Sequence, residues 1–112
     1  MNNAQQAGWH FADTTAVDWQ EVANELFNLP VRYKVAGAAE GFVMLLMKLP
    51  PGISSPAHTH ETMEFLYVLE GSVRSNGVEM NPGHGCGSAT GATHSEFTSD
   101  HGATVLVLVK QP

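Results

Sequence analysis

Glycine and proline recur at short intervals after Pro30, and this punctuation limits the length of regular elements more than any other feature. The apolar run 42–49 must end at Pro50, because proline lacks the amide donor and fixes its own backbone angle. Asn76 and Gly77 separate two further short segments. This dipeptide is the strongest local signal of a β-hairpin, since both central residues of a type I′ turn need positive φ. The pattern predicts short antiparallel strands.

Several short segments of this kind, separated by turn residues, are typical of an all-β sandwich or barrel. Segment 37–41, with a glycine at each end, is expected to be a turn. We expect strands at 31–35, 42–49, 64–70, 73–75, 78–80 and 104–109.

The segment before Pro30 differs from the rest of the chain. Residues 1–17 are polar and mixed, as in an arm or an edge strand. From Asp18 on, apolar side chains recur at intervals of three and four residues, as on one face of a short helix. These side chains are Trp19, Val22, Ala23, Leu26 and Phe27. We therefore expect an N-terminal arm and short helix over 1–29, packed on a single barrel domain over 30–112.

Composition excludes several classes of protein. With 112 residues, 43% of them hydrophobic and 14% charged, the chain has enough apolar material for one folded domain. The net charge is −6 and the basic residues are scattered, so no nucleic-acid binding is expected. No apolar run is long enough to cross a membrane, and the N-terminus has no signal-peptide pattern, which favours a cytoplasmic protein. The single cysteine, Cys86, cannot form an internal disulfide, and we expect it to be buried.

Four side chains suited to metal chemistry stand at informative spacings. His58 and His60 lie two residues apart, so on a strand both point to the same face. If residues 61–63 make a tight reversal, Glu64 returns on the neighbouring antiparallel strand and faces the histidine pair. His94 follows another strand that a sandwich brings opposite the first two. The sequence thus predicts that three imidazoles and one carboxylate converge, a donor set suited to divalent metals.

The same residues give the chain a resemblance to the cupin superfamily. The first cupin motif, G(X)5HXH(X)3-4E(X)6G, matches at every fixed position from Gly52 to Gly71. The second, G(X)5PXG(X)2H(X)3N, aligns from Gly83, with Ala89 where proline is usual and Thr98 where asparagine is usual. The resemblance implies a cupin-type double-stranded β-helix, which is a small jelly-roll barrel. It further implies one divalent metal ion bound by His58, His60, Glu64 and His94.

The leading functional hypothesis is a dioxygenase-like enzyme with a mononuclear non-haem metal, acting on a small organic substrate. The donor set suits Fe, Mn, Ni, Zn or Cu, and does not choose among them. An apolar pocket around the metal is expected, lined by Met44, Leu46, Leu66 and Val68. Glu64 and Glu96 are the candidate catalytic carboxylates, because Glu96 lies two residues past His94 and can share its inward face.

Two other functions fit the same residues. The chain is also similar to the cupin domain of zinc-binding anti-sigma factors, which implies a sensory or regulatory module that binds metal and a small ligand without catalysis. A metal-dependent isomerase is the second alternative, since function resides in the pocket and not in the barrel. The resemblance further implies a homodimer, because cupins commonly dimerise. His84 is expected to end a strand.

Overall fold

The computed structural model describes residues 6–23 and 26–111, and every regular element in this part of the chain is a β-strand. The all-β prediction is therefore confirmed. The strands are β1 (Gln20–Val22), β2 (Val31–Ala39), β3 (Phe42–Leu49), β4 (Ile53–Ser55), β5 (His58–Thr59), β6 (Glu64–Gly71), β7 (Val73–Ser75), β8 (Val78–Met80), β9 (Gly85–Ser88), β10 (Thr93–His94), β11 (Phe97–Ser99) and β12 (Ala103–Lys110). None of the described residues forms a helix that could cross a membrane.

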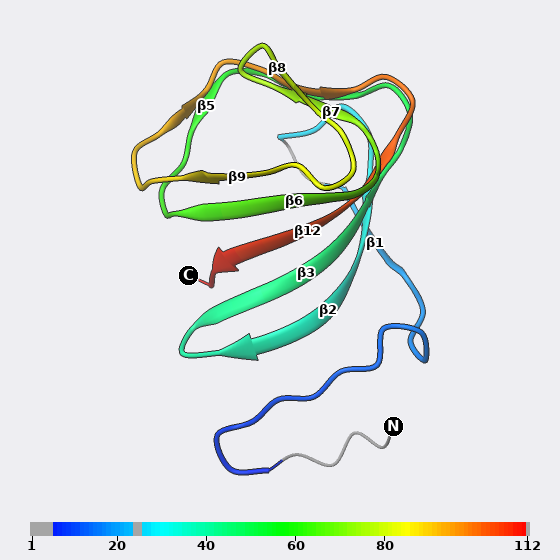
Figure 1. The fold of residues 1–112 in the computed structure, drawn as a ribbon, viewed down its shortest axis with the longest axis vertical. Helices are drawn as coiled ribbons and strands as arrows, with labels where there is room; N and C mark the ends of the chain where they lie inside the picture. The colour runs from blue at the N-terminus through cyan, green and yellow to red at the C-terminus, as the bar shows by residue number, and fades with distance from the viewer. Residues whose placement is uncertain (1–5, 24–25, 112) are drawn as a thin grey trace.

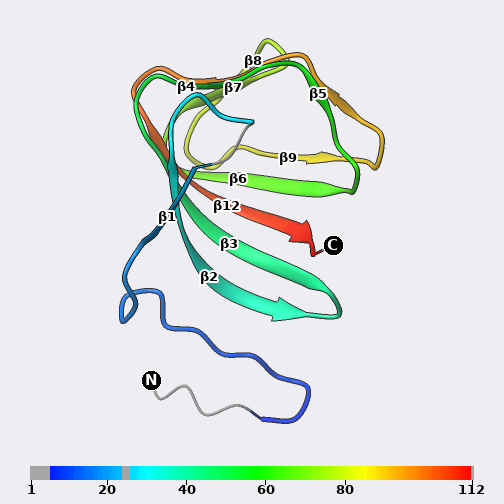
Figure 2. The same cartoon turned by 180° about the vertical axis from the view of Figure 1, so that it is seen from behind.

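The strands form two main sheets that close over each other. A six-stranded sheet has the order β1-β2-β3-β12-β6-β9, and a four-stranded sheet has the order β4-β11-β7-β8. A two-stranded ladder, β10-β5, lies at one end of the barrel. All pairings are antiparallel. Figures 1 and 2 show the long strands β2, β3, β12 and β6 stacked side by side, with the four-stranded sheet folded over beside β9.

The turn residues form the two hairpins where the sequence predicts them, but one of the two turns is shorter than predicted. Asn76 and Gly77 both have positive φ, 52° and 77°, and join β7 to β8. The turn predicted at 37–41 contracts to Glu40 and Gly41, with φ of 54° and 78°, because β2 continues through Ala39. A register shift between Val35 and Gly37 makes this continuation possible, since an extra residue in one strand keeps the ladder paired beyond the irregularity.

The prediction of a short helix before Pro30 is wrong. Residues 20–22 form strand β1, which pairs with β2 so that Gln20 lies opposite Tyr33; residues 24–25 of the expected helix lie outside the described part. A helix this short gains little stability from its own hydrogen bonds. The edge of β2 instead offers unpaired backbone groups. Tyr33 Oη also donates a hydrogen bond of 2.8 Å to Gln20 Oε1.

The N-terminal arm runs beyond the β2 edge of the barrel (Figures 1 and 2). Lys34 of β2 attaches the arm to the barrel. The Nζ atom of Lys34 donates a 2.7 Å hydrogen bond to Thr14 O and lies 4.7 Å from the centre of the Trp19 ring. Farther out, Trp9 stacks on Phe11 with ring centres 5.9 Å apart and is 65% exposed. The arm is thus attached near Trp19 and Thr14 and less covered toward Trp9.

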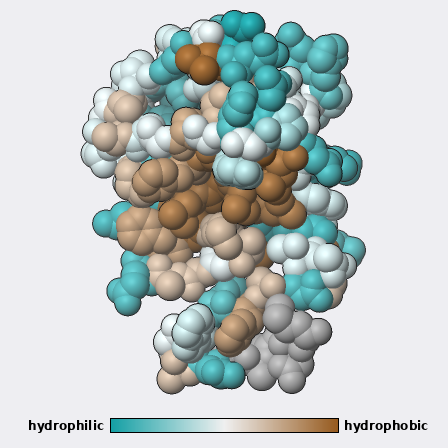
Figure 3. Space-filling view, in the orientation of Figure 1, coloured by the Kyte–Doolittle hydropathy of each residue, from teal (hydrophilic) through white to brown (hydrophobic). Residues whose placement is uncertain are grey.

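The core lies between the two main sheets, where inward-facing side chains of β6 and β12 meet those of the smaller sheet. Val68 and Val105 are at most 1% exposed, and Ile53 on β4 is equally buried. The core cluster comprises Val31, Leu49, Ile53, Leu66, Val68, Val73, Met80, Phe97, Ala103, Val105 and Val107. Hydrophobic side chains also gather across the middle of the molecular face in Figure 3.

The barrel closes tightly where β6 ends. Gly71 has a φ of 73° and lies opposite Ala103 of β12. A Cβ atom on Gly71 would meet Gly102 O in a severe clash and would lie 2.9 Å from Ala103 Cα. The two backbones can approach this closely only because Gly71 carries no side chain.

We expect Gly71→Ala to lower the free energy of unfolding by about 2–5 kcal/mol, the sum of left-handed backbone strain and overpacking. Gly52→Ala is the matched control, because Gly52 has a similar φ of 81° and open space around the added Cβ. The control should lose only about 1–2 kcal/mol. Urea denaturation of both variants measures the difference, and equal losses would contradict the proposed backbone contact.

Candidate metal centre

A short ladder joins two segments that lie far apart in the sequence. His58 of β5 lies directly opposite His94 of β10. The pairing continues one residue further, since His60 N donates to Ala92 O and Gly91 N donates to His60 O, each at 2.9 Å. His60 therefore belongs to the same ladder as His58, and both side chains point to one face.

The ladder gathers three imidazoles into one cluster. One ring nitrogen from each of His58, His60 and His94 can be chosen so that all three lie within 4.8 Å of one another. The centre of the His58 ring lies 5.1 Å from the ring centres of both His60 and His94. The ring centres of His60 and His94 are 4.5 Å apart. His60 is the most buried, at 9% exposure. Three converging imidazoles fit a divalent metal ion of borderline softness, so the donor set suits such a site.

Glu64 reaches this cluster by a different route from the one expected. Residues 61–63 do not turn the chain back beside β5; they carry it across to the six-stranded sheet, where β6 pairs with β12 and β9. Glu64 thus faces the histidines from the opposite sheet. Its Oε2 lies 3.5 Å from His60 Nδ1, beside the cluster and not within it. Direct ligation by Glu64 stays a prediction.

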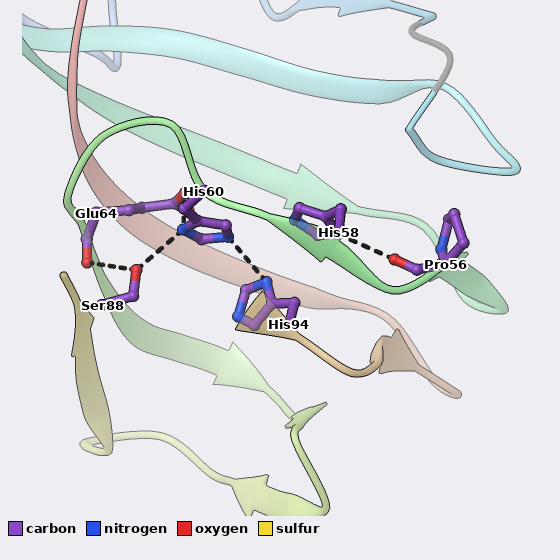
Figure 4. Close-up of polar contacts among 6 residues, drawn as sticks. All are labelled: Pro56, His58, His60, Glu64, Ser88 and His94. Atoms are coloured by element: carbon purple, nitrogen blue, oxygen red, sulfur yellow. Dashed lines mark hydrogen bonds and ion pairs between the residues drawn. The ribbon is translucent and has the colours of Figure 1, made fainter. Parts of the chain in front are cut away.

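Hydrogen bonds fix which nitrogen of His60 and His58 carries a proton (Figure 4). Ser88 Oγ donates its single proton to Glu64 O at 3.3 Å, so at 3.0 Å from His60 Nδ1 it must accept. His58 Nδ1 lies 3.0 Å from Pro56 O, which can only accept. We therefore assign the proton to Nδ1 in both rings. His60 Nε2 then accepts a 3.0 Å hydrogen bond from His94 Nδ1, and a metal ion at His60 Nε2 would replace this bond. The Nε2 lone pair of His58 is available for a metal ion.

Burial shifts the protonation of two groups at the cluster. It raises the pKa of Glu64, and the neighbouring His60 and His58 offset this only in part. It lowers the pKa of His94, and repulsion from His60 and His58 acts in the same direction. A lowered pKa keeps His94 neutral, which is the form that binds a metal ion.

Two supporting residues were not singled out from the sequence. Ser88 lies opposite Glu64 in the β6–β9 pairing, and no local pattern distinguishes it from other serines. Asn76 was identified only as a turn residue, yet its Nδ2 donates to Thr93 O at 3.1 Å and its Oδ1 accepts from Ser95 N at 2.7 Å. It therefore holds the residues on both sides of His94.

The remaining candidates lie apart from the histidine cluster. Glu96 Oε1 accepts a 3.0 Å hydrogen bond from Gly77 N at the β7–β8 turn, and a catalytic role for Glu96 stays a prediction. Cys86 is exposed, contrary to expectation, because β9 is the open edge of its sheet. His84 lies just before β9, and its Nδ1 accepts from Asn81 N at 3.0 Å.

An apolar cavity of about 160 Å³ opens at the histidine cluster. His58, His60, Glu64 and His94 line one part of it, and its other walls include Leu45, Met47, Leu49, Ser55, Leu66, Phe97, Val105, Val107 and Val109. A larger open groove of about 500 Å³ near β8 and β9 touches only His60 and His94 of the cluster. The small cavity is therefore the space that all three imidazoles share.

The pocket residues expected on β3 face the wrong way. Leu45 and Met47 line the cavity, so Met44 and Leu46 point to the opposite face of the sheet. Leu66 lines the cavity as expected, whereas Val68 lies in the core. The run 42–47 is apolar throughout, so its sequence does not show which alternate residues face inward.

Solved structures with this architecture define the class of protein. An acetylacetone dioxygenase from Acinetobacter johnsonii is 9% identical, with a TM-score of 0.79 over 98% of this chain and 79% of that chain. The polyketide cyclase RemF from Streptomyces resistomycificus is 23% identical, with a TM-score of 0.75 over 90% and 78% of the two chains. At these identities the likeness shows the fold alone. The barrel is the small jelly roll of the cupins.

The sequence also assigns the chain to a family within this class. A family profile described as the ChrR cupin-like domain matches residues 8–112, and the chain belongs to that family. The anti-sigma factor ChrR of Rhodobacter sphaeroides, solved in complex with SigE, is 19% identical, with a TM-score of 0.67. The alignment covers 85% of this chain and 50% of that chain. A search of curated protein sequences gives no match.

We expect Asn76→Gly to lower the free energy of unfolding by about 1–2 kcal/mol and to weaken zinc binding. Glycine tolerates the positive φ of Asn76 but removes its hydrogen bonds to Thr93 and Ser95. Asn76→Asp separates the two contacts, because it keeps the Oδ1 acceptor for Ser95 N and loses the donor to Thr93 O. Denaturation and competition with a chelating dye measure the two effects, and an Asn76→Gly variant equal to wild type in both would contradict this role.

In the metal-free protein, we expect Glu64→Gln to be more stable than wild type at pH 7. The pKa of Glu64 is raised above its ordinary 4.5, so stability present below pH 4.5 is lost as the pH rises through the folded-state pKa. Glutamine is neutral throughout, so the advantage of the variant should grow from pH 4.5 to 7. Urea denaturation across this range measures it, with the exposed Glu79→Gln as control. A variant less stable than wild type at pH 7 would refute the dominance of burial.

Proposed function

We propose that this chain binds one divalent metal ion through His58, His60 and His94 and acts as a dioxygenase-type enzyme on a small organic substrate. One observation carries the proposal: three imidazoles, each able to offer one ring nitrogen to the same metal ion, face a shared apolar cavity. A purely structural metal site is normally closed by four protein ligands, whereas a catalytic site keeps a position open. The cavity gives a substrate direct access to that open position.

Iron is the metal we propose, because a solved structure of similar fold is an acetylacetone dioxygenase. When bound, ferrous iron would mediate the reaction of dioxygen with the organic substrate, which is itself the net source of electrons. The chain itself contributes a wall of aliphatic side chains that excludes water from the reacting atoms. Glu64 is the carboxylate that we propose to complete the metal site or to take up a proton there, since its raised pKa favours proton uptake.

A regulatory function is the second candidate, and the match to the ChrR cupin-like family favours it. In this case the metal ion and a small ligand would stabilise one state of the barrel for a partner protein. Turnover separates the two functions, because a regulatory module binds a ligand and returns it unchanged. A metal-dependent isomerase would convert its substrate without consuming oxygen. The homodimer expected from the cupin resemblance stays a prediction that light scattering can test.

The first experiment is elemental analysis of protein purified without oxygen or chelators, with His94→Ala as the control. We expect close to one metal ion per wild-type chain and a large loss in the variant. Oxygen consumption by the iron-loaded protein with 2,4-pentanedione and other small diketones then tests the reaction. Metal equally absent from both proteins would refute the site, and stoichiometric iron without oxygen uptake would refute the dioxygenase assignment.

We expect Ser88→Ala to weaken zinc affinity about 10-fold or more, because the His60 ring loses the acceptor that orients its Nδ1 proton. Ser88→Thr keeps the hydroxyl and should restore most of the affinity. Chelator competition measures both values, and nitrogen NMR of the imidazoles reports the His60 tautomer. Unchanged affinity and an unchanged tautomer in Ser88→Ala would show that Ser88 does not position His60.

A further inference from the structure

Two buried serines on neighbouring strands differ in one respect. Ser99 of β11 is 2% exposed, and its Oγ donates a 2.7 Å hydrogen bond to Ser72 O. Ser55 of β4 is 6% exposed, and its Oγ has no hydrogen-bond partner among the residues that the structure describes. A buried hydroxyl without a partner destabilises the folded protein, so such a group needs an explanation.

The position of Ser55 supplies that explanation. Ser55 lies opposite Phe97 in the β4–β11 pairing, and both residues line the apolar cavity that the three histidines share. A bound molecule can therefore meet the Ser55 hydroxyl and the imidazole cluster within one cavity. Apart from the cluster and Glu64, Ser55 is the one polar side chain among the described residues that line this cavity.

The charge of the cavity limits what binds there. All five cationic side chains of the chain lie within the described part, and none of them lines the cavity. A carboxylate or phosphate on the substrate would find no positive partner at the Ser55 end. The volume of about 160 Å³ is also below the ~300–1,000 Å³ usual for drug-sized ligands. The cavity suits a small neutral molecule.

We propose that Ser55 binds the substrate, and that the substrate is a small neutral molecule with an apolar body and a carbonyl or hydroxyl oxygen that hydrogen-bonds to Ser55 Oγ. Its role as substrate, with a second oxygen directed at the histidine cluster, rests on the function proposed above. The hydroxyl can donate to a carbonyl and accept from an alcohol, so both groups satisfy it. Binding relieves the cost of the unpaired hydroxyl, which makes Ser55 a specificity-determining residue.

Thermal unfolding of the metal-free protein gives the first test. Ser55→Ala removes a hydroxyl that has no partner, so its Tm should equal or exceed that of wild type. Ser99→Ala is the matched control, because it removes an equally buried hydroxyl that is hydrogen-bonded, and its Tm should fall. A fall in Ser55→Ala as large as that in Ser99→Ala would overturn the proposal, since it would show that the fold already uses the Ser55 hydroxyl.

Ligand binding to the metal-free protein gives the second test. The probes are 2-pentanone and 2-methyl-1-pentene, which differ by replacement of the carbonyl oxygen with a methylene group. NMR titrations should show the ketone binding about three- to tenfold more weakly to Ser55→Ala than to wild type, with the alkene binding both proteins alike. Acetate should not compete. Equal ketone affinity for the two proteins, or displacement of the ketone by acetate, would overturn the proposal.

These measurements separate this proposal from the proposed function. Neither requires a metal ion or turnover, so a loss of ketone affinity in Ser55→Ala supports the ligand class even when the loaded protein consumes no oxygen. In the reverse case, the loaded protein consumes oxygen and Ser55→Ala has the same KM for the substrate as wild type. That result would keep the dioxygenase assignment and overturn the role of Ser55. Ser55→Thr, which keeps a hydroxyl, should retain ketone binding if the added methyl group fits.

Discussion

The pairing of β5 with β10 is the constraint on which the candidate metal centre depends. This ladder has two register pairs and two further backbone hydrogen bonds at His60, and it joins segments that lie far apart in the sequence. Each backbone hydrogen bond contributes about 1 kcal/mol net to the free energy of unfolding, and a ladder this short is therefore weak by itself. It is held from outside by the side chain of Asn76, which reaches across from the β7–β8 turn. Asn76 therefore helps to hold the His94 side of the histidine cluster in place.

The centre also depends on how the two main sheets are placed relative to each other. The ladder supplies the histidines, whereas β6 and β9 of the six-stranded sheet supply Glu64 and Ser88. The contacts of Glu64 and Ser88 with His60 therefore depend on the distance between the ladder and the six-stranded sheet. That distance is set by the packing of the core, because side chains such as Val68 and Val105 fill the space between them. Core packing therefore helps to set how Glu64 and Ser88 approach His60.

The sequence contained the local chemistry of this protein but not its long-range partners. The Asn76–Gly77 hairpin follows from backbone angles that few residues tolerate, so a dipeptide is enough to predict it. The expected helix before Pro30 failed because an unpaired strand edge, invisible in the local pattern, pairs with residues 20–22 instead. The prediction of which β3 side chains face inward was wrong, because every side chain in 42–47 is apolar and the pattern does not distinguish the two faces. Ser55 and Ser88 have no sequence signature at all, since their roles depend on which strands become neighbours.

The close approach at Gly71 changes how the cupin motif itself should be understood. The motif spans Gly52 to Gly71, and its histidines and glutamate gather around one cavity. Gly71 lies at the far end of β6, against Gly102, where its function is to let two backbones touch. A motif match therefore combines two separate physical requirements, one for donor atoms and one for the closing of a barrel. A chain of this fold without the histidines would still need the glycine, so it would match part of the motif with none of the chemistry.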